Sequence, residues 1–306
     1  MKLRFVRSFT LITTLLLVQP GIHPVYAQLN VEESLTPEEL VDLLIGDGVS
    51  VSNISYTGAD VAQGRFWGES NLGIDSGLIL TSGRATNAIG PNTSTGISYN
   101  NGASGDPDLT QLANDPTNDA SVLEFDFVPQ SSNMQFSYVF GSDEYLEFVD
   151  SYNDAFGFFI SGPGISGTFS NNGINIAVIP GTDNTYVTID SVNNEDHSEF
   201  YYDNPNGQTI EYDGFTKGGM LWPVLRAIAE VTPCSTYHIK LTVGDAVDRA
   251  LDSGVFLEAN SFNAVGVSST VNFDSPYIDS IAVEDCNSAQ IKFSTSCING
   301  MPAGIH

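Results

Sequence analysis

Apolar and polar residues alternate with a period of two along most of this chain, and this alternation limits the possible folds more than any other feature. Leu123, Phe125 and Phe127 alternate with Glu124 and Asp126, as expected for a strand with one buried and one exposed face. Similar short runs, separated by Gly, Asn, Asp and Pro, occur at residues 136–140, 156–160, 174–179, 186–189, 221–231, 237–243 and 255–262. Many short strands with turn residues between them predict an all-β fold, an antiparallel β-sandwich of the jelly-roll kind.

Three of these segments are rich in aromatic residues. We expect the strands over 122–128, 134–140 and 155–161 to be paired and to lie at the centre of the sandwich. The chain shows no regular alternation of strands with helices, and this argues against an α/β fold.

One short N-terminal helix is expected before the first strands. Thr36 is a suitable N-cap, Pro37 suits the first helical position, and Glu39 completes a capping box. An apolar stripe at helical spacing follows, formed by Leu40, Leu43 and Leu44. The sequence therefore predicts a helix over 36–45, ended by Gly46 and packed at an edge or end of the sandwich.

Residues 1–27 have the three zones of a secretory signal peptide. Lys2, Arg4 and Arg7 precede a short apolar run over 9–18, and Ala27 supplies a small residue for cleavage. The apolar run is shorter than the roughly 20 residues that span a bilayer. We predict cleavage after Ala27 and a secreted or outer-cell-surface location, with no transmembrane segment in the mature chain.

The remaining chain divides by composition. Residues 28–35 form a polar leader, and residues 36–265 carry the strands of one β-sandwich domain. A long segment over 87–118, poor in apolar residues, is expected to be a surface excursion. Residues 271–306 resemble the start of a second, incomplete β module.

The acidic composition excludes one class of partner. The signal peptide has three basic and no acidic residues, so its removal takes the formal net charge from −27 to −30. Such a charge repels the phosphates of nucleic acids and suits divalent cations. Only 15% of residues are charged and 41% are apolar, which differs from a disordered acidic tail.

The three cysteines match no zinc-binding spacing. Cys286 and Cys297 are close in sequence and could form a disulfide after export, which would leave Cys234 unpaired.

Several long motifs occur in a fixed order between residues 36 and 262. They are GIDSGLIL at 73–80, VLEFDFVP at 122–129, FSYVFGSDEY at 136–145, FGFFISGPG at 156–164, YDGF at 212–215 and DSGVFLEA at 252–259. With these motifs the chain resembles the choice-of-anchor L domain, a family of secreted domains from Bacteroidota and other bacteria. The resemblance implies export and surface display.

Acidic residues cluster in three places. The first cluster spans 143–154, the second 245–252, and the third comprises acids of the long segment, Asp106, Asp108, Asp115 and Asp119. Calcium takes oxygen ligands from carboxylates, amides and carbonyls. We hypothesise that Ca²⁺ is bound at one end of the sandwich by five of these acids: Asp143, Glu144, Asp154, Asp245 and Asp252. The alternative is that they are solvated acids of loops and turns.

Catalytic constellations are absent from the sequence, so we predict no catalytic residue. The chain has no Gly-x-Ser-x-Gly and no His-Glu-x-x-His motif, and His238 is expected on a strand surface.

Aromatic residues in polar surroundings are candidates for ligand binding, namely Trp67, Tyr201 and Tyr202. Trp222 lies in an apolar run and is expected in the core.

The sequence thus favours a secreted or cell-surface, non-enzymatic β-sandwich module that is calcium-stabilised and binds an extracellular glycan or protein, as in adhesion. One alternative is a secreted, glycosidase-like hydrolase with paired carboxylates. Another is a structural spacer within a longer surface protein.

Overall fold

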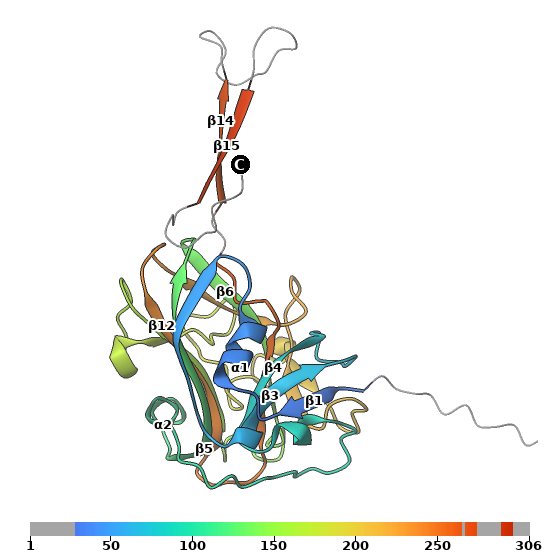
Figure 1. Cartoon of the computed structure of the whole chain (residues 1–306). Helices are drawn as coiled ribbons and strands as arrows, with labels where there is room; N and C mark the ends of the chain where they lie inside the picture. The colour runs from blue at the N-terminus through green and yellow to red at the C-terminus, as the bar shows by residue number, and fades with distance from the viewer. Residues whose placement is uncertain (1–27, 265–266, 274–288, 296–306) are drawn as a thin grey trace, which may run out of the picture.

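The residues that alternate with period two form the strands of two antiparallel sheets, which pack face to face as a sandwich (Figure 1). The computed structural model describes residues 28–264, 267–273 and 289–295. The eight-stranded sheet has the order β1 (Asn30–Glu33), β3 (Gln63–Trp67), β4 (Ser76–Thr81), β13 (Ser253–Glu258), β6 (Asn133–Ser142), β10 (Gly214–Thr216) and β9 (Tyr201–Asp203), and β11 (Leu225–Glu230) also pairs with β6. The five-stranded sheet has the order β2 (Val49–Thr57), β5 (Thr117–Pro129), β12 (Tyr237–Ala246), β7 (Ala155–Ser161) and β8 (Ile174–Asn175). The predicted antiparallel β-sandwich is confirmed.

Burial follows the alternation where a strand has one solvated face. In β5, Leu123, Phe125 and Phe127 are fully buried, whereas Glu124 and Asp126 are partly exposed. The strand β6 differs because both of its faces are covered. Phe140 enters the main core between the sheets, while Val139 joins a second cluster on the outer face of the eight-stranded sheet.

The three aromatic strands lie inside the sheets, but they do not pair with one another. β5 and β7 flank β12 in the five-stranded sheet, and β6 lies in the opposite sheet. Their rings meet across the sandwich. The ring centroids of Phe136 and Phe158 are 4.9 Å apart, and those of Phe140 and Phe156 are 4.5 Å apart. These strands therefore hold the two sheets together by facing each other.

The predicted N-terminal helix is α1 (Pro37–Leu44). Its capping box is present, because the Glu39 N–H donates to the Thr36 hydroxyl at 3.3 Å and the Thr36 N–H donates to the Glu39 carboxylate at 2.9 Å. Its buried residues are Leu40, Val41 and Leu44. The helix contacts β2 of one sheet and β3 and β4 of the other, so it covers the side of the sandwich where these strands lie (Figure 1).

A second short helix, α2 (Pro107–Ala113), lies in the long segment over 87–118. Asp106 is its N-cap and accepts hydrogen bonds from the backbone N–H groups of Asp108 and Leu109. Short 3₁₀ turns occur at Asp60–Ala62, Ala85–Ala88, Ser170–Asn172 and Ser198–Phe200. In the part of the chain that the structure describes, no helix is long and apolar enough to cross a membrane.

The two ends of the described chain add strands. The segment expected to be a leader, 28–35, contains β1, which pairs with β3 and so belongs to the sandwich. Near the other end, β14 (Val267–Phe273) and β15 (Ala289–Thr295) form a two-stranded sheet of their own. The predicted signal peptide, 1–27, lies outside the described residues, as does most of 271–306.

Cys234 is disulfide-bonded, so it is not the unpaired cysteine that the sequence analysis considered. Cys286 and Cys297, which the sequence analysis considered as a pair, lie outside the described residues, but a chain with three cysteines cannot form both that disulfide and one at Cys234.

Candidate functional site

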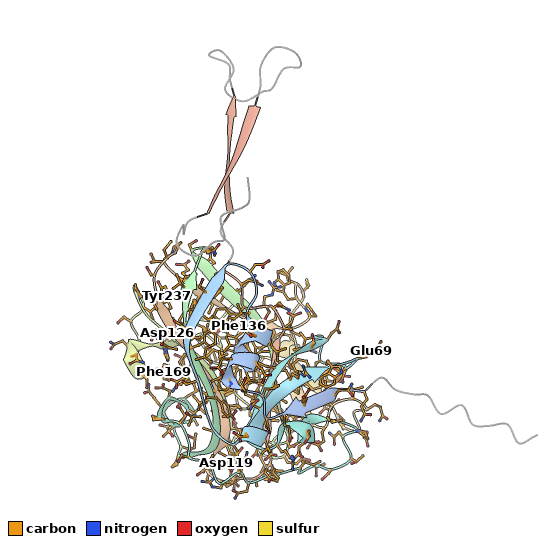
Figure 2. All side chains as sticks on the ribbon, viewed as in Figure 1. Glu69, Asp119, Asp126, Phe136, Phe169 and Tyr237 are labelled. Carbon is orange, nitrogen blue, oxygen red and sulfur yellow. The ribbon has the colours of Figure 1, made fainter. Side chains whose placement is uncertain are left out.

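Strand ends from both sheets bring a group of acidic residues together. β6 ends immediately before Asp143, while β7 and β13 begin immediately after Asp154 and Asp252. β12 carries Asp245 next to its last residue, where its pairing with β5 shifts register. In an antiparallel sheet the end of one strand lies beside the start of its neighbour. These positions therefore meet at the end of the sandwich where Figure 2 shows Asp119.

We call seven of these carboxyl groups the buried acid cluster: Asp143, Glu144, Asp154, Glu211, Asp213, Asp245 and Asp252. It contains all five acids that the sequence analysis proposed as calcium ligands, and none of those five is more than 1% exposed. The alternative, that they are solvated loop acids, does not fit this burial. Cation binding by them stays a prediction.

Two members of the buried acid cluster are held by fixed donors. Asp154 accepts a hydrogen bond from the Ala246 N–H at 2.8 Å, and its other oxygen lies 2.8 Å from the Ser253 hydroxyl. Asp252 accepts from the Tyr99 N–H at 3.0 Å. These donors fix the positions of two carboxyl groups inside the protein, since buried polar groups are normally hydrogen-bonded.

The polar segment 87–118, expected to be a surface excursion, lies against the cluster. The Asp252 N–H donates to the Ile97 carbonyl at 3.2 Å, and the Asn101 side chain donates to the Gly83 carbonyl at 2.6 Å. A Cβ atom at Gly83 would lie 1.6 Å from a carboxylate oxygen of Asp252. Only a glycine at this position lets the carboxylate approach the backbone so closely.

Other members of the cluster have oxygens that no donor reaches. Both carboxyl oxygens of Asp143 and of Glu211 are buried without a hydrogen-bond partner, as is one oxygen each of Glu144, Asp213 and Asp245. None of the ion pairs formed by the described Lys, Arg and His side chains includes an acid of the cluster. A buried, uncompensated charge costs on the order of several kcal/mol. The cluster must therefore be neutralised by protons or by a bound cation.

The pKa values of the cluster reflect this burial. Burial raises the pKa of Glu144 to about 9 and that of Asp252 to about 7. Burial also raises the pKa of Asp143 well above its ordinary value, and the charge of the neighbouring Glu211 is the next cause. These groups hold protons near neutral pH unless a cation takes their place.

The sequence analysis did not include Glu211 and Asp213. Asp213 directly precedes β10, which is the same relation to a strand that Asp154 and Asp252 have to β7 and β13, and Glu211 stands two residues before Asp213. An acid immediately before a predicted strand at this end of the sheet is the sequence signal that could have found Asp213. The motif at 212–215, used only for the family resemblance, contains Asp213.

Acids of the third sequence cluster have basic partners instead. The buried Lys240 Nζ lies 2.8 Å from a carboxylate oxygen of Asp106 and 2.5 Å from one of Asp108. Asp119 forms an ion pair with Arg249. Lys240 and Arg249 thus offset part of the negative charge of the third cluster, which makes it a weaker candidate for a cation site than the buried acid cluster.

His238 lies on a strand surface, as predicted. Its side chain is one-third exposed and lies between two carboxylates, with ring nitrogens 2.8 Å from Asp126 and 3.3 Å from Glu124. The hydrogen bond to Glu124 raises the pKa of His238. The contacts are those of an ion-paired surface histidine.

No three Asp, Glu, His or Cys side chains within the described ranges form a ready-made metal site. The acids of the cluster interact strongly in pairs, Asp143 with Glu211 and Asp154 with Asp245. Calcium takes about six to eight oxygen ligands and accepts carbonyls and water beside carboxylates. Two carboxylates supplemented by such oxygens would suffice to hold it.

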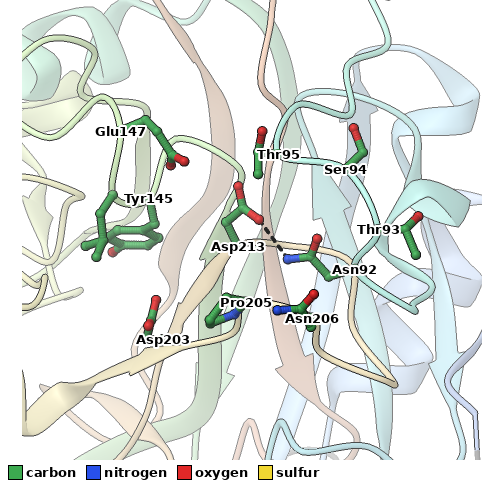
Figure 3. Close-up of a pocket in the computed structure, with 11 residues that line it drawn as sticks. Asn92, Thr93, Ser94, Thr95, Tyr145, Glu147, Asp203, Pro205, Asn206 and Asp213 are labelled. Carbon is green, nitrogen blue, oxygen red and sulfur yellow. Dashed lines mark hydrogen bonds between the residues drawn. The ribbon is translucent and has the colours of Figure 1, made fainter.

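One side of the cluster borders a pocket of about 510 Å³, which we call the acidic pocket (Figure 3). Its lining includes three acids, Glu147, Asp203 and Asp213. The Asn92 side chain donates to one oxygen of Asp213 at 2.7 Å. Asp213 thus belongs both to the buried acid cluster and to a surface that a ligand can reach.

The three aromatic candidates for ligand binding do not form one surface. Trp67 in β3 and Tyr202 in β9 are each about 40% exposed, but they lie on strands separated by four others in the eight-stranded sheet. At about 4.8 Å per strand, this separation is roughly 24 Å. Tyr201 is buried, with its ring centroid 4.9 Å from that of Tyr145, so it cannot stack on a ligand.

Trp222 is not in the core, contrary to the prediction. It precedes β11 instead of belonging to it, and it is 51% exposed with the Arg226 guanidinium 3.5 Å from its ring centroid. The adjacent Met220 and Leu221 are also exposed. The apolar run over 221–231 therefore consists of an exposed turn followed by a strand.

Comparison with known families identifies the family to which the sandwich domain belongs. A family model described as the Choice-of-anchor L domain matches residues 28–263, nearly all of the sandwich. The chain belongs to this family. Choice-of-anchor domains are typical of surface or secreted bacterial proteins. No curated protein and no solved structure matches the chain.

In this choice-of-anchor L domain, the buried acid cluster overlaps the motifs that carry the resemblance. Asp143 and Glu144 stand in the motif at 136–145, Asp213 stands in 212–215, and Asp252 opens 252–259. Three of the motifs thus contribute acids that meet at one end of the sandwich.

Proposed function

We propose that this choice-of-anchor L domain is an exported, non-enzymatic binding module of the bacterial surface, whose buried acid cluster holds a Ca²⁺ ion that stabilises the fold. The observation that carries the proposal is the set of buried carboxyl oxygens without donors or basic partners, above all those of Asp143 and Glu211. A cation that binds only the folded chain stabilises it by about 2.7 kcal/mol when the free ion is about a hundredfold above its dissociation constant.

The chemistry of the cluster favours calcium over other metals. Its members offer only oxygen ligands, and no cysteine or histidine belongs to it. Hard cations such as Ca²⁺ and Mg²⁺ prefer oxygen, and calcium tolerates irregular coordination better than magnesium does. Carboxylates that approach from two sheets and from loops form an irregular set.

Burial supports binding over hydrolysis. A glycosidase needs two carboxyl groups that flank the scissile bond, one of them an acid with a raised pKa in contact with the substrate. The strongly raised pKa values here belong to groups such as Glu144 and Asp252, which are each 1% exposed. A polysaccharide or peptide substrate has no access to them.

Thermal unfolding of the mature chain, which starts at Gln28, tests whether the folded protein binds calcium. The melting temperature should rise with added calcium and fall with chelator, and magnesium should have a smaller effect because it demands near-octahedral geometry. Calorimetric titration should give a defined number of calcium ions per chain. Equal melting temperatures in calcium and in chelator would refute the calcium part of the proposal.

Export has its own test. Protein recovered from outside the cells should begin at Gln28 when its N-terminus is sequenced. External material that still carries Met1 would contradict signal-peptide cleavage, and material found only in the cytoplasm would contradict export.

A further inference from the structure

The acidic pocket has a pronounced charge imbalance. Glu147 and Asp203 are exposed at its rim, and Asp213 is a buried lining residue. No lysine, arginine or histidine is among the residues that line the pocket.

One buried carboxyl oxygen that lines the pocket has no partner. Asp213 is 8% exposed, and while one of its oxygens is held by Asn92, the other has no donor. Figure 3 shows Asp213 between Asn92 and the side of the pocket that carries Glu147 and Tyr145. Unsatisfied buried groups of this kind require an explanation, and a ligand that donates hydrogen bonds would provide one.

We infer that the acidic pocket binds a primary ammonium group on a flexible stem, the lysine side chain of a basic polypeptide. The inference rests on the proposed binding function and names the class of partner. An ammonium group has three donors around one compact charge. The carboxylates of Glu147, Asp203 and Asp213 offer three acceptors to it.

The surroundings of the pocket favour this ligand over a sugar. Sugars commonly stack on exposed aromatic rings, but the aromatic residue that lines the pocket, Tyr145, is 1% exposed. The rim instead carries small polar side chains, Thr93, Ser94 and Thr95, and the side chain of Asn206. These can bond the backbone of a bound peptide. The formal charge of −30 on the mature chain attracts basic partners at long range.

Fluorescence anisotropy with a labelled tetralysine peptide tests the inference. The mature protein is titrated at moderate salt, with calcium and separately with chelator. We expect saturable binding, and a matched peptide with acetylated lysines should bind at least about tenfold more weakly, because acetylation removes the charge and two of the three donors. Equal binding of the two peptides would overturn the inference.

Variants distinguish binding in the acidic pocket from non-specific attraction to the net negative charge of the protein. Glu147→Gln and Asp203→Asn lie at exposed positions, so they should fold normally, and each should weaken tetralysine binding by about three- to tenfold. Glu69→Gln and Asp115→Asn make the same changes of charge at exposed positions outside the pocket and should leave binding within about twofold. Equal losses in both sets would mean non-specific attraction and would overturn the pocket assignment.

The calcium proposal and this inference fail in different ways. A melting temperature that does not respond to calcium, together with charge-specific tetralysine binding, would refute only the calcium site. A calcium-dependent melting temperature without tetralysine binding would refute only the lysine pocket.

Discussion

The carboxyl groups of Asp143 and Glu211 are neighbours inside the sandwich, and burial followed by the charge of Glu211 raises the pKa of Asp143. No donor reaches any of their four oxygens. Two carboxylates cannot both stay ionised at such a distance without compensation, so one must carry a proton or the pair must face a cation. We therefore expect the stability of this domain to depend on pH and, under the calcium proposal, on calcium as well.

In the presence of a chelator, the stability of the fold should fall as the pH rises, which is the opposite of ordinary acid denaturation. The folded pKa values of Glu144, about 9, and Asp252, about 7, lie above their unfolded values. The stabilisation by these protonated groups is complete below the unfolded pKa of about 4 and is lost as the pH rises through about 7 to 9. One pKa unit corresponds to about 1.4 kcal/mol, so urea midpoints should fall clearly from about pH 6 to about pH 9.

Calcium should reduce that loss, since it binds the deprotonated carboxylates and takes over the role of the protons. The urea midpoints should be measured over the same pH range in saturating calcium and compared with those in chelator. A chelated protein that becomes more stable from about pH 6 to about pH 9 would show that the cluster is not held by protons.

Asp143→Asn should have opposite effects in chelator and in calcium. Neither oxygen of Asp143 has a donor in the described structure. The substitution removes a buried carboxyl group that needs a proton or a cation to stay there, so in chelator at about pH 8 we expect the melting temperature to rise, by an amount equivalent to about 1–2 kcal/mol. The calcium-induced rise should shrink because a ligand is lost. Asp115→Asn, at an exposed position, is the control, and an equal calcium response in all three proteins would exclude Asp143 as a ligand.

Lys240→Met should destabilise the domain by about 3 kcal/mol or more, because removal of one partner leaves a buried charge uncompensated. The lysine is 6% exposed and contacts both Asp106 and Asp108. Urea unfolding measures the change. Adding Asp106→Asn and Asp108→Asn to the variant should restore part of the loss, whereas Lys217→Met, which breaks none of these ion pairs, should cost little. No recovery in the triple variant would argue for lost packing instead of charge.

Phe158→Ala should cost about 3–5 kcal/mol through the cavity that it leaves between the sheets. The ring of Phe158 has its centroid 4.9 Å from those of both Phe136 and Tyr138 in the opposite sheet. Chemical unfolding should show a lower midpoint with an unchanged slope. Ile228→Ala, at a position 56% exposed, should change stability by less than about 0.5 kcal/mol. Similar losses in the two variants would contradict the cross-sheet packing.

The sequence alone determined the features that depend on local periodicity and local hydrogen bonds. The alternation in 122–128 specified a strand, and the order Thr36, Pro37 and Glu39 specified a capped helix. Neither requires knowledge of distant residues, since a strand face and a helix cap are set within a few positions of the chain. The five acids proposed as ligands were also found from sequence, because each stands at the end of a strand.

The tertiary structure alone decided which charges meet. Glu211 and Asp213 join the buried acid cluster because β10 pairs with β6, a pairing that no local pattern encodes. Lys240 forms an ion pair with Asp106 across more than a hundred residues of chain, which offsets charge in the third sequence cluster. Packing likewise buried Tyr201 and left Trp222 exposed, contrary to what their sequence neighbours suggested. Burial and pairing depend on how the two sheets come together, and that is a property of the whole fold.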